Sequence, residues 1–108
     1  MSYWVYLRIN TGGRNDAEIY SRNMTSNVAP MWRKAGIDLQ ECDGKPVTDV
    51  LPVLRAAVAA INDPSEYAAY KALEPSNGWG DYAGAVQFLE ELLRACEDNP
   101  ACTVDVSY

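Results

Sequence analysis

The stretch Tyr3-Trp4-Val5-Tyr6-Leu7-Arg8-Ile9-Asn10 decides the fold, because its side chains alternate between two faces. Successive side chains of a strand point to opposite sides, so this alternation, with its aromatic and β-branched content, predicts a strand. The face that starts at Tyr3 is mostly aliphatic and is expected in the core. The other face carries Trp4 and Tyr6, so we expect it to be covered as well, at least in part.

The residues on either side of this strand supply its partners. Residues 11–16 have the glycine, asparagine and aspartate content of a turn, and residues 17–22 read as a second, weaker strand, which gives a hairpin. Residues 103–108 alternate again at the other end of the sequence. A strand this short needs a partner, and the hairpin is the one available, so we expect a small antiparallel or mixed sheet.

Four helices are expected between the hairpin and the last strand. The first follows the capping residues Thr25-Ser26-Asn27 and ends at Gly36, and residues 37–46 read as a loop with at most one helical turn. The second begins near Thr48 or Asp49. A short third helix follows Asp63-Pro64, where an N-cap precedes proline.

The strongest helix pattern follows Asp81 and reaches Cys96, with its apolar residues on one face and its charges opposite. The order is therefore β-β-α-α-α-α-β. Helices grouped between strands favour an α+β fold, in which the sheet packs against about four helices. The length of 108 residues fits a single domain, residues 1–108.

Charge and cysteine usage narrow the class of protein. The formal net charge is -6, and all of it arises from residues 55–108. This disfavours direct nucleic-acid binding and suits a protein partner with a basic surface, although a solvated helix surface explains the same charges. Cys42, Cys96 and Cys102 lack metal-site spacing and are expected to be free, partly buried thiols. We expect no metal and no cofactor. With no membrane-length apolar run and no signal-peptide pattern, a cytoplasmic location is expected.

Catalytic signatures are absent from the sequence. It contains no histidine, and no GxSxG, P-loop or EF-hand pattern. An enzyme would rely on Asp81 or Glu18 as a base with a pKa raised by burial. Helix capping is the simpler role for Asp81, so we expect a non-catalytic protein.

Polar and aromatic residues gather in two segments, each at an expected helix start. One is the segment Asn23–Trp32, and the other is Asn77-Gly78-Trp79-Gly80-Asp81-Tyr82. Amides and a carboxylate beside indole rings suit a flat polar ligand or a peptide. The competing interpretation, which we favour, is that the polar residues cap helices and the tryptophans fill the core. The candidate binding residues are Asn23, Asn27, Trp32, Arg33, Asn77, Trp79, Asp81 and Tyr82.

The motifs Tyr20-Ser-Arg-Asn-Met-Thr-Ser-Asn-Val-Ala-Pro-Met-Trp32 and Pro75-Ser-Asn-Gly-Trp-Gly-Asp-Tyr82 resemble a group of small proteins from actinobacteria and their phages. With the leucine-rich helix and the ending Thr103-Val-Asp-Val-Ser107, the resemblance covers nearly the whole chain. The family is uncharacterised, so the resemblance implies an origin and a layout but no activity and no catalytic residue.

These observations predict a small phage- or prophage-type accessory protein that acts by binding a host or phage macromolecule, without catalysis. Self-association through Trp4, Tyr6, Tyr67 or Tyr70 is one form this binding could take. The alternative is a small-molecule or nucleotide binder. Its cleft would lie between the segments Asn23–Trp32 and Asn77–Tyr82, with Arg22 or Arg33 meeting the phosphate.

Overall fold

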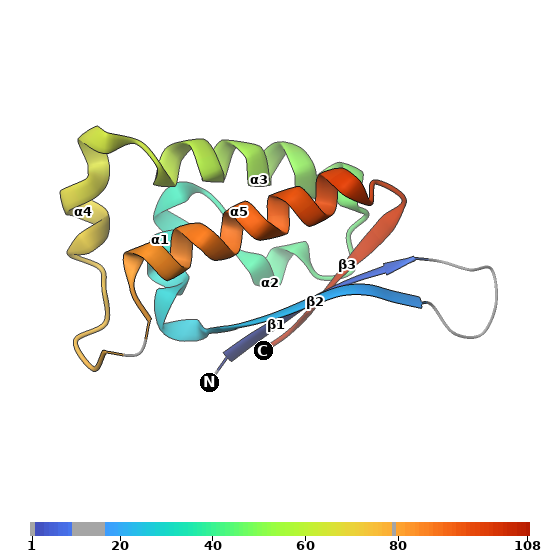
Figure 1. Cartoon of the computed structure of the whole chain (residues 1–108), viewed down its shortest axis with the longest axis horizontal. Helices are drawn as coiled ribbons and strands as arrows, with labels where there is room; N and C mark the ends of the chain where they lie inside the picture. Colours follow the sequence, from blue (N-terminus) through green and yellow to red (C-terminus); the bar gives the residue numbers. More distant parts are fainter. Residues whose placement is uncertain (1, 10–16, 79) are drawn as a thin grey trace.

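The computed structural model describes residues 2–9, 17–78 and 80–108, which form a three-stranded antiparallel sheet in the order β2-β1-β3 (Figure 1). Strand β1 (Ser2–Ile9) is central, between β2 (Ala17–Thr25) and β3 (Cys102–Ser107). The α+β prediction is confirmed, as are the pairing of the hairpin strands and the pairing of the last strand with the hairpin. The predicted turn at residues 11–16 lies outside the described residues.

Five α-helices and two short 3-10 turns connect β2 to β3. Their bounds are η1 Ser26–Val28, α1 Ala29–Ala35, α2 Leu39–Cys42, α3 Val47–Ile61, η2 Pro64–Glu66, α4 Tyr67–Lys71 and α5 Tyr82–Asp98. The four expected helices correspond to α1, α3, η2 with α4, and α5. The additional helix α2 is one turn within the expected loop, and Asp38 caps it by accepting the Gln40 backbone N–H.

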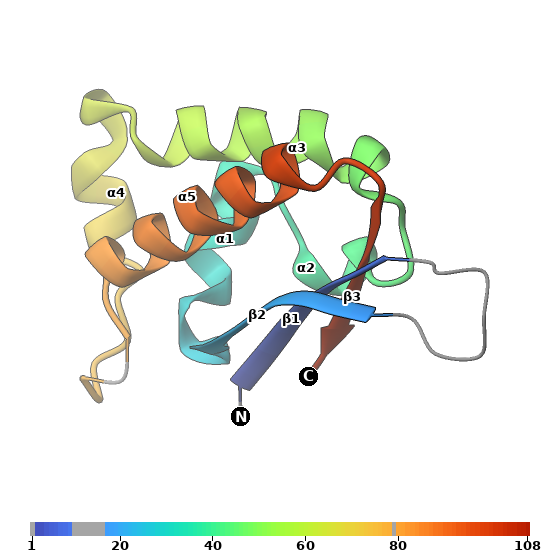
Figure 2. The same cartoon turned by 45° about the vertical axis from the view of Figure 1, so that its right-hand side comes forward.

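The helices lie on one side of the sheet. Figure 2 shows them above the sheet, and the other side of the sheet faces away from them. The long helices α3 and α5 pack against each other, and α1 packs against both. The core lies between this helical layer and the sheet face that carries Tyr3, Val5 and Leu7. Trp32, Tyr70 and Phe88 are among the largest fully buried side chains.

The second face of β1, which we expected to be covered at least in part, is partly buried but is not covered by any described helix. Trp4 is 43% exposed, and Tyr6 and Arg8 are only partly buried. The described helices lie on the opposite side of the sheet (Figure 2), where Tyr3, Val5 and Leu7 share one buried cluster with apolar residues of α1, α3 and α5. Aromatic content identified the strand correctly, but it does not report which sheet face receives the helices.

The two edges of the sheet differ. Beside β3, residues Asp43–Pro46 run along the edge: the Gly44 N–H donates to the Val104 carbonyl, and the Val104 N–H donates to the Lys45 carbonyl. The Asp43 carboxylate accepts the Val106 N–H, and Pro46 bridges Thr103. Beside β2, the described part of the chain supplies no comparable backbone partner on the outer side. Among the described residues, no helix has both the length and the apolar content needed to cross a membrane.

Candidate functional site

The uncovered face of the sheet carries a row of three side chains along β1: Trp4, Tyr6 and Arg8. The rings of Trp4 and Tyr6 are stacked, with centroids 6.2 Å apart and planes inclined by 16°. The Arg8 guanidinium carbon lies 5.1 Å from the centre of the Tyr6 ring. These contacts restrict the rotamers of the three side chains in the free protein. Less side-chain entropy is therefore lost when a partner binds.

Polar side chains flank this row on both neighbouring strands. Directly opposed residues of an antiparallel pair share a face. The strand register places Asn23 and Ser107 beside Trp4, Ser21 and Asp105 beside Tyr6, and Glu18 and Thr103 beside Arg8. We call these nine residues the open face. The open face has an aromatic centre and polar margins. Protein interfaces have the same arrangement: a few central aromatic and arginine side chains carry most of the binding energy, and polar residues surround them.

One ion pair fixes the position of Arg8. Its Nε lies 2.5 Å from Oδ2 of Asp105, and both side chains are a little over one third exposed. An ion pair this exposed contributes little to stability, at most about 1 kcal/mol. Its consequence is positional, since it holds the guanidinium beside Tyr6.

The predicted set of binding residues does not form one surface. Trp32 is 1% exposed, and its indole N–H donates to the Ala85 carbonyl at 3.2 Å. Its ring packs against Phe88 and Tyr3, with centroids 5.0 and 5.7 Å away. Trp32 therefore fills the core, as the structural interpretation proposed.

Tyr82 and Asp81 organise the start of α5. The Asp81 carboxylate caps the helix by accepting the Gly84 N–H at 2.7 Å, as predicted. The Tyr82 hydroxyl donates to the Ile61 carbonyl, and its backbone N–H donates to Glu74 at 2.8 Å. That backbone hydrogen bond, with the Lys71 ammonium, holds the pKa of Glu74 below its usual value. These contacts tie the residue 74–82 connection to α3 and α4.

The two polar-aromatic segments do meet. A Cβ placed on Gly80 would lie 2.8 Å from both Thr25 Cγ2 and Val28 Cγ1, and one on Gly84 would lie 3.2 Å from Met24 Cε. Their contact is close enough to require glycine at position 80, where φ is +101°. The segments therefore touch at Gly80 through packed side chains.

The remaining predicted residues lie apart. Asn23 belongs to the open face, and its amide donates to the Tyr3 carbonyl at 3.1 Å. Asn27 is partly buried in η1, and its N–H donates to Thr25 Oγ1. Arg33 is exposed in the last turn of α1, and Asn77 is exposed before Gly78. Trp79 lies outside the described residues.

Two cavities open on the described surface, and both lie away from the Gly80 contact. One, of about 80 Å³, lies between α2 and α3 and is lined in part by Cys42, Lys45 and Asp49. The other, of about 430 Å³, is a groove between β2 and α5. No group of three or more histidine, cysteine or carboxylate side chains among the described residues is arranged to hold a metal ion.

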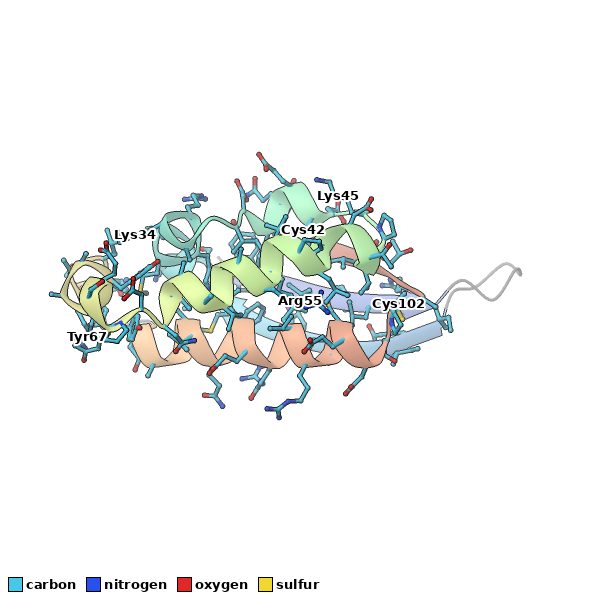
Figure 3. The ribbon with its side chains drawn as sticks, turned by 90° about the horizontal axis from the view of Figure 1, so that it is seen from above. Lys34, Cys42, Lys45, Arg55, Tyr67 and Cys102 are labelled. Atoms are coloured by element: carbon cyan, nitrogen blue, oxygen red, sulfur yellow. The ribbon has the colours of Figure 1, made fainter. Side chains whose placement is uncertain are left out.

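The three cysteines are free and buried. Burial raises the pKa of Cys96 to about 12 and that of Cys42 to about 11, although Lys45, which lies beside Cys42 in Figure 3, opposes the second shift. A thiol acts as a nucleophile when its pKa is lowered and it is accessible to solvent. Because these thiols are buried, and because the pKa values of Cys42 and Cys96 are raised, we expect them to be unreactive core side chains.

Sequence reasoning named Trp4 and Tyr6 only as contacts for self-association, and it gave Arg8 no role. The signal that could have identified them was the aromatic residues on the second face of an otherwise amphipathic strand. No family model, curated protein or solved structure matches the chain. The resemblance to small proteins of actinobacteria and their phages therefore stays a prediction.

Proposed function

We propose that this protein is a non-catalytic accessory protein that binds a protein partner through the open face. The observation that carries the proposal is the Trp4-Tyr6-Arg8 row, which stands on the uncovered side of the sheet. Tryptophan, tyrosine and arginine are the residue types that dominate binding energy in protein interfaces, and they do so when polar neighbours exclude water around them.

The rigidity of the row supports this assignment. Its three side chains lie on the central strand, and the stacking and ion pair described above hold them in place. Binding therefore requires little ordering of the protein, so more of the contact energy is available for affinity. A protein of charge -6 is expected to prefer a partner with basic residues around the contact.

The alternative of a small-molecule or nucleotide cleft between the two polar-aromatic segments has less support. Their contact is filled by Thr25, Val28 and Met24 against Gly80 and Gly84. The two cavities named above have linings that include none of the predicted binding residues. Asn23 is one member of that set that contributes to the proposed interface.

The proposal is tested by affinity capture from an actinobacterial lysate with three forms of the protein: wild type, Trp4→Ala and Val53→Ala. The two substituted side chains have matched exposures, 43% and 44%, but Val53 lies on α3. A protein captured by the wild type should be lost with Trp4→Ala and retained with Val53→Ala, because a tryptophan at an interface centre is worth about 2 kcal/mol or more. Equal capture by the two variants would contradict the assignment.

A further inference from the structure

Among the described residues, no backbone partner lies along the outer edge of β2, whereas residues 43–46 pair with the edge of β3. Residues 43–46 satisfy the backbone groups of β3 at Val104 and Val106. Strand β2 pairs with β1 on its inner side, and within the described chain its outer side meets no other backbone. An open edge presents unpaired N–H and carbonyl groups, which an extended segment can pair with as an added strand.

A groove lies directly beside this edge, between β2 and the C-terminal half of α5. It is a shallow groove of about 430 Å³ that is largely open to solvent. Its lining residues are Ile19, Tyr20, Glu91, Arg94, Ala95, Asp98 and Asn99. The Arg22–Glu91 ion pair connects the strand to the helix beside it. An added strand would therefore project alternate side chains toward this groove.

The end of the groove at the C-terminus of α5 favours a cation. Helix α5 ends at Asp98, and no basic residue occupies its last turn. Carbonyl groups at a helix C-terminus carry partial negative charge and favour cations, so carboxylates there are unfavourable without a counter-charge. Arg55 pairs with Glu97, but no ion pair within the described chain reaches Asp98. Of the two carboxylates in the lining, Glu91 is paired with Arg22, which leaves Asp98 without an ion pair among the described residues; Arg94 is the one cation of the lining.

The strand side of the groove supplies apolar surface and an unused polar atom. Ile19 is 47% exposed and has no partner on β1, because the register shifts between Leu7 and Arg8. The Tyr20 hydroxyl is buried and has no hydrogen-bond partner among the described residues. A long aliphatic side chain with a cationic head matches this surface, since its methylene groups would cover Ile19 while its N–H groups reach the exposed Asp98 carboxylate.

We propose that the edge of β2 binds an extended peptide segment as a fourth strand, with a lysine or arginine side chain of that segment in the groove beside Asp98. The occupant is a segment of another protein. A net charge of -6 makes two copies of the protein repel each other, which disfavours a second copy at this edge. This site is separate from the open face and does not depend on it.

The test is a titration of the whole protein with a synthetic ten-residue peptide that alternates lysine and threonine, followed by backbone amide NMR. Two matched peptides serve as controls: one with glutamate in place of lysine, and one N-methylated at alternate residues. The lysine peptide should shift the amides of Ile19–Met24 and Glu91–Asn99. The glutamate peptide should bind at least about tenfold more weakly, and N-methylation should abolish binding because it removes main-chain donors.

Charge-reversed variants locate the contact. Asp98→Lys should weaken binding of the lysine peptide about threefold to tenfold at low salt, as expected for loss and reversal of one partly exposed charge. Glu41→Lys, which makes the same charge change on α2 beside the other edge, should leave it unchanged. Trp4→Ala should also leave it unchanged, which separates this site from the open face.

Several results would overturn the proposal. They are equal affinity for the lysine and glutamate peptides, undiminished binding of the N-methylated peptide, equal effects of Asp98→Lys and Glu41→Lys, or no binding at millimolar peptide. A free protein that sediments as a dimer with β2 amides protected would assign the edge to a second copy instead.

Discussion

Replacing Gly80 with alanine should destabilise the protein because two requirements for glycine coincide there. The residue has φ +101°, a conformation that costs an L-residue about 1–2 kcal/mol. The added Cβ would also lie 2.8 Å from Thr25 Cγ2 and from Val28 Cγ1, and Val28 is fully buried. Overpacking of this kind typically costs ~1–3 kcal/mol, so the expected total is ~2–5 kcal/mol.

Gly78→Ala is the matched control. Gly78 has φ +77°, but a Cβ there meets no atom of the described residues within 4 Å beyond its chain neighbours, so only the backbone cost applies, about 1–2 kcal/mol. Urea unfolding followed by circular dichroism measures both variants, with equal m-values required for the comparison. The difference between them reports the contact between the two polar-aromatic segments. If Gly80→Ala lost no more stability than Gly78→Ala, the reasoning that these segments pack tightly would be refuted.

A second substitution tests which atoms cause the loss. Thr25→Ser removes Cγ2 and keeps Oγ1, which accepts the Asn27 N–H at 3.4 Å. In the Gly80→Ala background it should recover part of the lost stability, giving a favourable coupling energy of ~0.5–1.5 kcal/mol between the two positions. Strictly additive effects would mean that the clash with Thr25 is not the cause.

Further predictions concern the helix cap, the core tryptophan and the thiols. Asp81→Ala should cost about 1 kcal/mol in urea unfolding, and Asp81→Asn less, because asparagine keeps an acceptor for the Gly84 N–H; equal losses would argue against the cap. Trp32→Phe should cost ~1–3 kcal/mol, since it removes the buried donor to Ala85 and leaves a void, and an unchanged unfolding midpoint would contradict that role. Cys42 and Cys96 should resist iodoacetamide at pH 8 in the folded protein and react fully in urea, as mass spectrometry can measure. Burial raises their pKa values to about 11 and about 12 from 9.0, so the unfolded thiols ionise first and the free energy of unfolding should fall as pH rises above about 9; a stability that is flat from pH 8 to 10.5 would contradict this.

Local patterns predicted most of the elements of this fold. Alternation at residues 3–9 and 103–107 located two strands, and the Asp81 cap with its apolar stripe located α5. These features depend on near neighbours, which a sequence displays directly. The expected strand at residues 17–22 was too short, because pairing with β1 extends β2 to Thr25 and no local pattern encodes that partner.

The site was harder to predict because exposure is a tertiary property. Trp32 and Trp4 look equivalent in sequence, yet Trp32 lies under α5 with its N–H bonded to Ala85, and Trp4 stands on the open face. The stripes of α3 and α5 could have covered either face of β1. The choice follows from how Tyr3, Val5 and Leu7 pack with residues far along the chain, such as Phe88.

Site-specific photo-crosslinking is the direct way to establish whether a protein partner binds at the open face. A photoreactive phenylalanine analogue replaces Trp4 in one form and Val53 in another, and both are expressed in an actinobacterial host. We expect one discrete crosslinked protein from position 4, none from position 53, and loss of the crosslink when Arg8→Glu is added. Crosslinking from position 53 alone, or a position-4 adduct that persists unchanged with Arg8→Glu, would contradict that expectation.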